Sequence, residues 1–282
     1  VSRIKRISLE AYSQPWADGW LRGCPSDNLD TCLSNGAFRD AVKMRLCKQM
    51  FNGGEHCPLC RMVIDIHGHH VFACMCGGDK VLEHNEIRNE VHRVAKVAGA
   101  QPELEAGGLL GGLGWPGVAG RRPADTLLVV AREVRGTSRR AFARVAFDFA
   151  VTSPFSPYVL RLSSESGLAA AQQYASYKRR HLNTQEMCEA AGIGFEPIVF
   201  ESTGGLEPEA VGVLNSLLAM VADASGKAFA TEKERLMQRV SLILVRSHHR
   251  ALCRRRGGVA GGGVGEASAR VAEAEGTLES NV

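Results

Sequence analysis

RVAFDFAVTS, residues 144–153, places apolar side chains at every second position, namely Val145, Phe147, Phe149 and Val151. Successive residues of a strand point to opposite faces of a sheet, so this period of two predicts a strand with one buried face. Asp148 stands in the middle of that strand. A charged side chain inside an apolar strand is costly unless it is paired or coordinated. The segment therefore indicates both a sheet and a candidate site.

Two further segments predict strands, RRPADTLLVV (121–130), which we expect beside 144–153, and FEPIVFEST (195–203). Helical periodicity follows in four segments, residues 82–98, 164–182, 211–225 and 231–256. The helix at 164–182 should direct Lys178 toward the sheet. Together these patterns predict an α/β fold in which helices flank a mixed sheet.

The composition narrows the class of protein. The chain has 282 residues, of which 45% are hydrophobic, enough to bury one core with a small satellite domain. The formal net charge is only +4, so nucleic-acid binding would depend on local basic clusters. No apolar run approaches the roughly 18 residues of a membrane span, and we expect a soluble, intracellular chain without a membrane partner. The initial valine suggests that the sequence begins inside a longer reading frame.

A zinc site is predicted by the spacing Cys-x2-Cys-x8-His-x4-Cys, formed by Cys57, Cys60, His69 and Cys74. Zinc favours four thiolate or imidazole ligands in a tetrahedron, and four protein ligands leave no open position, so the ion would be structural. His67, His70 and Cys76 lie within reach, and the histidine ligand stays open among His67, His69 and His70. The alternative is a group of buried cysteines with histidines nearby by chance.

A magnesium site is predicted by two aspartates on neighbouring strands. Asp125 opens one strand and Asp148 lies in the middle of the next. Carboxylates that converge on a divalent metal, together with a lysine that stabilises charge, are what phosphodiester hydrolysis needs. The alternatives are that Asp148 faces solvent on an edge strand and that Asp125 is a turn residue after proline.

The order of these features resembles a known family, the restriction-like endonuclease domain of certain non-LTR retrotransposons, within the PD-(D/E)XK superfamily. The resemblance covers roughly residues 16–205. It rests on an ordered series, CPLCRMVIDIHGHHVFAC, HNEIRNEVHRVAKVAG, RRPAD, AFDFAVTSP, YASYKRR and GFEPIVFESTGG. The resemblance implies a restriction-endonuclease-like fold with a small N-terminal zinc knuckle of the CCHC type.

Site residues follow from the resemblance by position. Asp125 and Asp148 would hold Mg or Mn, Lys178 would be the catalytic lysine, and a further acid would come from the first helix. Glu86 and Glu90 compete for that last role, and Glu90 is expected to be the deeper of the two. Nucleic acid would be contacted by His84, Asn85, Arg121, Arg122, Arg179 and Arg180.

The sequence also departs from the family. Glu83 replaces the usual arginine before the His-Asn pair, and we expect this to weaken DNA binding. Ala150 stands where the parent superfamily often has its lysine, and the basic insert AREVRGTSRRAFAR (131–144) separates the two aspartates. His181 and Leu182 replace the lysine and tyrosine that the family tends to show.

The sequence thus predicts a metal-dependent DNA endonuclease that nicks one strand, as a module of a retrotransposon-derived protein, with DNA and also RNA as candidate partners and a nuclear location. The alternative is a catalytically eroded, zinc-containing nucleic-acid-binding domain without cleavage activity. A protein-interaction scaffold on the same fold is a further rival. We expect these parts: a helical lead-in at 1–52, the CCHC knuckle at 53–80, the endonuclease-like core at 81–225, a basic helix at 226–256 and a disordered tail at 257–282.

Overall fold

The computed structural model describes residues 3–114, 120–135 and 141–257, and its centre is a mixed four-stranded sheet. The strands lie in the order β1 (Gln101–Leu104), β2 (Thr126–Arg135), β3 (Ala141–Thr152) and β4 (Gly194–Glu201). The pairs β1–β2 and β2–β3 are antiparallel, whereas β3 and β4 are parallel. The predicted α/β class with a mixed sheet is confirmed.

The alternation in β3 sorts its side chains between two layers. Val145, Phe147 and Phe149 lie in the largest buried cluster, with the helices of one face. Ala146 and Ala150 point to the other face and belong to two smaller clusters. Small side chains on that face leave room for the polar group of Asp148, which lies between them in sequence.

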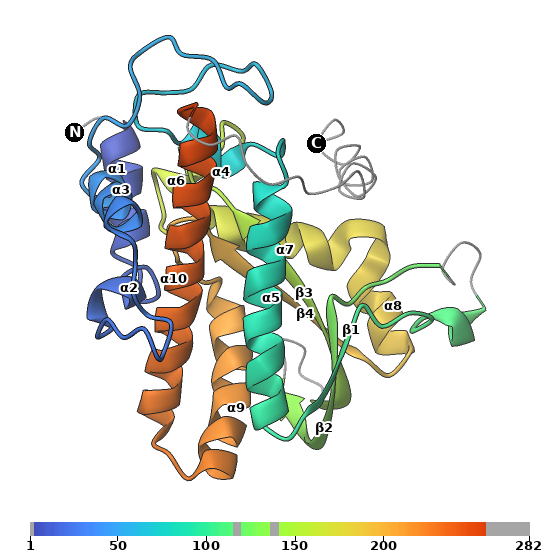
Figure 1. Cartoon of the computed structure of the whole chain (residues 1–282). Coiled ribbons are helices and arrows are strands. Elements are labelled where there is room, and N and C mark those ends of the chain that lie inside the picture. Colours follow the sequence, from blue (N-terminus) through green and yellow to red (C-terminus); the bar gives the residue numbers. More distant parts are fainter. Residues whose placement is uncertain (1–2, 115–119, 136–140, 258–282) are drawn as a thin grey trace.

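Two long helices, α5 (Asp79–Val97) and α9 (Pro208–Ser225), pack on the first face of the sheet, and a third, α10 (Phe229–Arg255), packs on both of them. The three helices run alongside one another (Figure 1). Each contributes apolar residues at helical spacing, such as Ile87 and Val91 of α5, to the cluster that contains Phe147. Side chains of α10 from Leu236 to Arg255 are buried, so this helix packs into the fold along most of its length.

The second face carries α7 (Ala169–Arg180) and α8 (Thr184–Ala190), which follow the short α6 (Leu160–Ser163) and are joined by the 3₁₀ turn His181–Asn183. Ala171 and Ala175 of α7 pack on Ala150 and Val199 of the sheet. The helix predicted from residue 164 begins only at Ala169, since Leu168 has a φ of 63°, outside the right-handed helical region.

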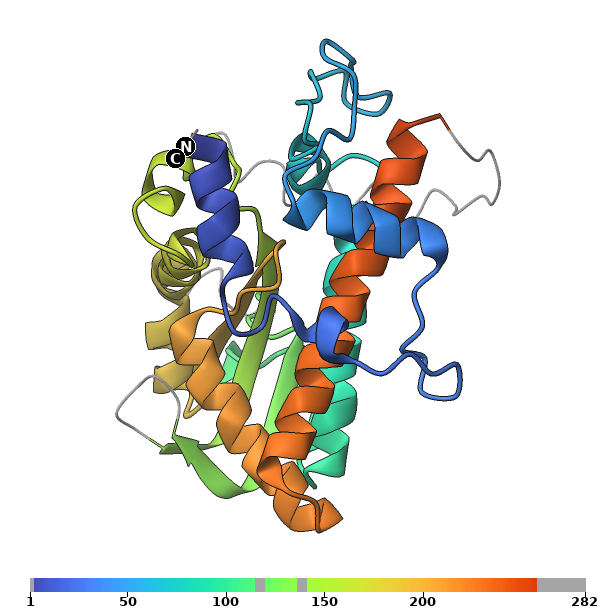
Figure 2. The same cartoon turned by 90° about the vertical axis from the view of Figure 1, so that its left-hand side faces the viewer.

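The N-terminal segment contains α1 (Arg3–Tyr12), α2 (Gly19–Arg22) and α3 (Asn35–Arg45), and it is followed by the cysteine-rich segment with α4 (His70–Ala73). α3 crosses α10 (Figure 2). Ile7 of α1, Phe51 and Cys57 share one buried cluster with Leu252 of α10. The predicted lead-in and knuckle therefore pack against the C-terminal helix.

The predicted basic insert is largely strand. β2 continues to Arg135 and β3 begins at Ala141, with Val134 paired with Phe142 after a register shift, so the insert lengthens this hairpin. A 3₁₀ turn at Gly111–Leu113 lies in the glycine-rich segment before it. The predicted disordered tail lies outside the described residues from 258 onward. Among the described helices, none is long and apolar enough to cross a membrane.

Candidate functional site

An ion pair joins the sheet to α7 at the position that the sequence singled out. Nζ of Lys178 lies 3.1 Å from Oδ2 and 3.2 Å from Oδ1 of Asp148. The side chains of Lys178 and Asp148 are only 25% and 17% exposed, so water screens this pair weakly. Lys178 comes from the last turn of α7, which packs on β3 and β4, and the helix therefore directs the ammonium to the middle of β3.

Asp125 lies beside this pair, immediately before β2. Its Oδ2 accepts a hydrogen bond of 2.6 Å from the backbone N–H of Phe149, the residue that follows Asp148. The register places Thr126, next to Asp125, opposite Phe147. The two carboxylates thus lie at one place on neighbouring strands, as the sequence analysis expected. We name Asp125, Asp148 and Lys178 the acidic centre.

The pKa values of the two carboxylates in the acidic centre are shifted in opposite directions. Burial raises the pKa of Asp148 to about 6, and the charge of Asp125 adds to this rise, although Lys178 opposes it. Burial also acts to raise the pKa of Asp125, but the hydrogen bond from His84 and the amide of Phe149 outweigh it, and its pKa is lowered. The neighbouring carboxylates raise the pKa of Lys178 despite its burial. Perturbed groups of this kind gather at functional sites and also in structural ion pairs.

His84, predicted to contact nucleic acid together with Asn85, contacts Asp125 of the acidic centre, and Asn85 contacts His84; both side chains are partly exposed. Nε2 of His84 lies 3.0 Å from Oδ2 of Asp125, and its Nδ1 lies 3.2 Å from Oδ1 of Asn85. The pKa of His84 is raised, since the contact with Asp125 outweighs burial, which would lower it.

Glu90 does not join the acidic centre. Its carboxylate is buried, as expected, but it pairs with Arg93 at 2.6 Å and with Arg239 of α10 at 3.6 Å. Glu86 pairs with Arg250 of α10. Both glutamates therefore lie on the side of α5 that faces α10, because at about 100° per residue the two and six positions that separate Glu86 and Glu90 from His84 turn their side chains away from it. This placement does not fit a third acidic ligand from α5.

Three of the four arginines predicted to bind nucleic acid contact other groups of the protein. Arg179 pairs with Glu209, and Arg121 donates to the carbonyl of Leu182. Arg180 donates through Nε to Ser176, and Arg122 is exposed. Arg121 and Arg180 therefore lie at the same end of α7, near its last turn. Three arginines near the end of α10 are also paired: Arg254 and Arg255 pair with Asp79, and Arg256 pairs with Asp40.

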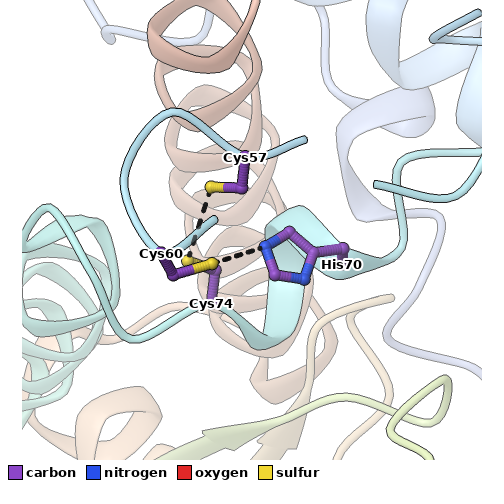
Figure 3. A group of neighbouring side chains, drawn as sticks. All are labelled: Cys57, Cys60, His70 and Cys74. Atoms are coloured by element: carbon purple, nitrogen blue, oxygen red, sulfur yellow. Dashed lines mark hydrogen bonds between the residues drawn. The ribbon is translucent and has the colours of Figure 1, made fainter. Parts of the chain in front are cut away.

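A second site lies in the cysteine-rich segment. The ligand atoms of Cys57, Cys60, His70 and Cys74 all lie within 4.8 Å of one another and point to a common centre (Figure 3). Sγ of Cys57 is 4.0 Å from Sγ of Cys74, and Sγ of Cys60 is 3.2 Å from Nε2 of His70. In a tetrahedral zinc site with Zn–S bonds of about 2.3 Å, sulfurs lie about 3.8 Å apart. The four residues could therefore hold a metal ion, and this donor set suits zinc.

His70, and not His69, completes this cluster, which corrects the ligand set given by the sequence spacing. His70 and Cys74 are four residues apart on the single turn of α4, so their side chains share a face. His69 instead stacks on Phe155, with ring centroids 3.8 Å apart, and its Nδ1 lies 3.1 Å from Asp65. The third candidate, His67, has its Nδ1 3.5 Å from the carbonyl oxygen of Lys48.

Asp65, which the sequence analysis did not single out, organises this turn. Its Oδ1 accepts from the backbone N–H of His67 at 3.0 Å, and its Oδ2 accepts from the N–H of His70 at 2.9 Å. Burial would raise the pKa of Asp65, but the contact with the imidazole of His69 and the backbone N–H groups of His70 and His69 hold it far below its usual range. An aspartate before the histidine run, in the Asx-turn pattern, is the signal that could have identified it.

The thiols of the cluster differ in acidity. Burial opposes ionisation of Cys57, but the backbone N–H groups of Cys60 and Leu59 outweigh it and lower its pKa to about 6. Burial and the neighbouring thiols raise the pKa of Cys60 to about 11. The thiolate is the form that binds a metal, so the lowered pKa of Cys57 favours metal binding.

Within the described ranges, the Cys57 cluster is the one group of three or more histidine, cysteine or carboxylate ligands that meets this spacing. The acidic centre supplies two carboxylates and a lysine. Magnesium sites often use only one or two protein carboxylates and complete their octahedron with water and substrate phosphate. No protein-family model matches the chain, and no curated protein sequence matches it either.

Proposed function

We propose that this chain is a metal-dependent endonuclease that nicks one strand of DNA, of the restriction-like type found in non-LTR retrotransposons, with a structural zinc knuckle. The observation that carries the proposal is the acidic centre. There, Nζ of Lys178 lies 3.1 Å from Oδ2 of Asp148, and Asp125 accepts a hydrogen bond from the backbone N–H of Phe149. A purely structural role would not require this arrangement, because burying two carboxylates beside each other opposes folding.

The topology also supports the restriction-like assignment. In the order α5, β1, β2, β3, α6, α7, α8 and β4, one acid lies at the start of β2, the other lies in β3, and the lysine comes from α7, which follows the short α6. This order agrees with the family resemblance, in which the acidic motifs lie on two strands and the lysine has moved to the next helix. The possible zinc ligands precede α5, as they do in that family.

Each side chain of the acidic centre would have a distinct role. The carboxylates of Asp125 and Asp148 would hold Mg²⁺ or Mn²⁺, and Lys178 would supply positive charge toward the phosphate as negative charge develops. A bound ion of this kind polarises the phosphate and lowers the pKa of an attacking water. Arg121, Arg122 and Arg180 would contact phosphates of the substrate, because Arg121 and Arg180 lie at the same end of α7 and Arg122 follows Arg121 in the sequence.

The test is a nicking assay on supercoiled plasmid with the zinc-loaded chain, with and without Mg²⁺ or Mn²⁺. We expect metal-dependent nicking that Asp148→Ala and Asp125→Asn abolish, while zinc content stays close to wild type and circular dichroism shows that both variants are folded. Asp223→Asn, an exposed carboxylate on α9, is the matched control and should leave nicking unchanged. Nicking that survives Asp148→Ala would remove this centre from the mechanism.

A second candidate is a catalytically eroded, zinc-containing domain that binds nucleic acid without cleaving it. Two observations favour it: Glu90 pairs with Arg93 and Arg239, away from the acidic centre, and Lys178 contacts both oxygens of Asp148. This candidate predicts binding that weakens with salt, without cleavage in either metal. A gel-shift assay at two salt concentrations beside the nicking assay separates the two candidates, and the scaffold alternative predicts neither binding nor cleavage.

A further inference from the structure

Two hydrogen bonds end on the same oxygen of Asp125. Its Oδ2 accepts from the backbone N–H of Phe149 at 2.6 Å and lies 3.0 Å from Nε2 of His84. Among the described residues, Oδ1 of Asp125 has no such contact. The backbone amide and the imidazole thus occupy one oxygen and leave the other available to a ligand.

His84 is itself held in place. Its side chain is 27% exposed, it comes from the first half of α5, and α5 packs on β3. Nδ1 of the ring lies 3.2 Å from Oδ1 of Asn85, so both ring nitrogens have partners. A ring fixed at both ends and attached to a long packed helix can hold a neighbouring carboxylate in one orientation.

We propose that His84 is a positioning residue, which holds Oδ2 of Asp125 so that Oδ1 is presented to the divalent cation shared with Asp148. Asn85 contacts the imidazole of His84 and so contributes indirectly to the orientation of Asp125. The inference rests on the proposed function and deepens it, because it assigns His84 to the metal site and not to a contact with nucleic acid. Groups that orient ligating carboxylates typically change metal affinity about 10- to 100-fold when they are removed.

The experiment measures Mn²⁺ binding to the full, zinc-loaded chain by calorimetric titration without DNA. We expect His84→Ala to raise the dissociation constant for Mn²⁺ about 10- to 100-fold, and His84→Gln, whose amide N–H can replace the imidazole donor, to restore much of the affinity. His92→Ala, eight residues further along α5, is the matched control and should bind Mn²⁺ as wild type does. Asn85→Ala, which leaves His84 in place, should weaken binding by a smaller factor and covers the case in which His84→Ala fails to fold.

The outcomes are distinguishable. If wild type binds Mn²⁺ and nicks DNA while His84→Ala and Asn85→Ala both bind Mn²⁺ normally, the inference is overturned and the proposed function stands. If His84→Ala weakens DNA binding in a chelator but leaves the affinity for Mn²⁺ unchanged, His84 contacts nucleic acid and the inference is again overturned. If wild type neither binds Mn²⁺ nor nicks DNA, the proposed function fails and the inference fails with it.

Discussion

Lys178 and Asp148 are thirty positions apart in the chain, yet the lysine Nζ lies 3.1 Å from the aspartate Oδ2, with both groups largely buried. The ion pair joins α7 to β3, the strand that contains Asp148. It also keeps the raised pKa of Asp148, about 6, below the value that burial alone would produce.

Lys178→Met should reduce the rate of metal-dependent nicking by about 100- to 1000-fold, because a positioned charge that stabilises the transition state typically contributes that much. Lys178→Arg should retain part of the activity, since its guanidinium keeps the positive charge but not the compact geometry of the ammonium. The measurement is the initial rate of plasmid nicking at saturating Mg²⁺.

Lys227→Met, a largely exposed lysine before α10, serves as the control and should nick at the wild-type rate. Wild-type nicking by Lys178→Met would show that the ammonium only neutralises Asp148. Zinc content should be the same in all of these variants, because Lys178 lies outside the cysteine-rich segment.

His70→Ala should release the zinc that wild type retains during dialysis, and it should lower the melting temperature, since metal binding contributes directly to folding in such small sites. His69→Ala should retain zinc, because His69 stacks on Phe155 and contacts Asp65 instead of the cysteines. Metal content by mass spectrometry and thermal unfolding provide the two measurements. Zinc loss in His69→Ala with retention in His70→Ala would reverse the assignment.

Most of the sheet could be predicted from local pattern. The alternation in residues 144–153 identified β3 and its buried face, and the placement of Asp148 among apolar residues identified the centre. Asp125 could be paired with it because strands joined by a hairpin are neighbours. Lys178 followed from helical periodicity together with the family resemblance.

Other features depend on contacts that local pattern does not contain. β1, Gln101–Leu104, is a short edge strand whose residues are mostly exposed, so no apolar alternation marks it. The ion pair of Glu90 with Arg239 joins residues about 150 positions apart, and the depth of Glu90 alone did not say which helix it faces. For His70, the spacing of four residues to Cys74 was a usable signal, but it required knowing that residues 70–73 form a helical turn.

Glu83 has a structural role that differs from the DNA-binding defect expected from its sequence position. Its carboxylate is 1% exposed and pairs with Lys80 and with His248 of α10 at 3.2 Å. Burial would raise the pKa of Glu83, but these two partners outweigh it and lower the pKa to about 2. Glu83 therefore points into the protein and not toward a bound phosphate.

Glu83→Arg, which introduces the family's usual residue, should therefore destabilise the fold by about 3–5 kcal/mol, because it removes a buried partner and adds a cation beside Lys80 and His248. Urea unfolding monitored by circular dichroism provides the measurement. Glu103→Arg, on the exposed edge strand, is the control and should change stability by about 0.5 kcal/mol or less. Tighter DNA binding by Glu83→Arg at unchanged stability would contradict this interpretation.

Glu201 is a buried carboxylate at the end of β4, on the side of the sheet that carries α7. Neither of its oxygens has a hydrogen-bond partner of normal geometry among the described residues. Burial raises its pKa to about 7, although the backbone N–H groups of Ala170 and Ala171, in the first turn of α7, and the hydroxyl of Thr203 act to lower it. The carboxyl is therefore easier to protonate in the folded chain than in the unfolded chain, where its pKa is near 4.5.

A folded-state pKa above the unfolded value means that the folded chain binds the extra proton between about pH 4.5 and 7, so the stability that protonation of Glu201 provides is lost as the pH rises through that window. Glu201→Gln cannot ionise. Its free energy of unfolding, relative to wild type, should therefore increase by up to about 3 kcal/mol from pH 4.5 to pH 8, whatever its absolute stability. Urea unfolding of both proteins across this range tests the difference, and a difference independent of pH would show that Glu201 titrates normally.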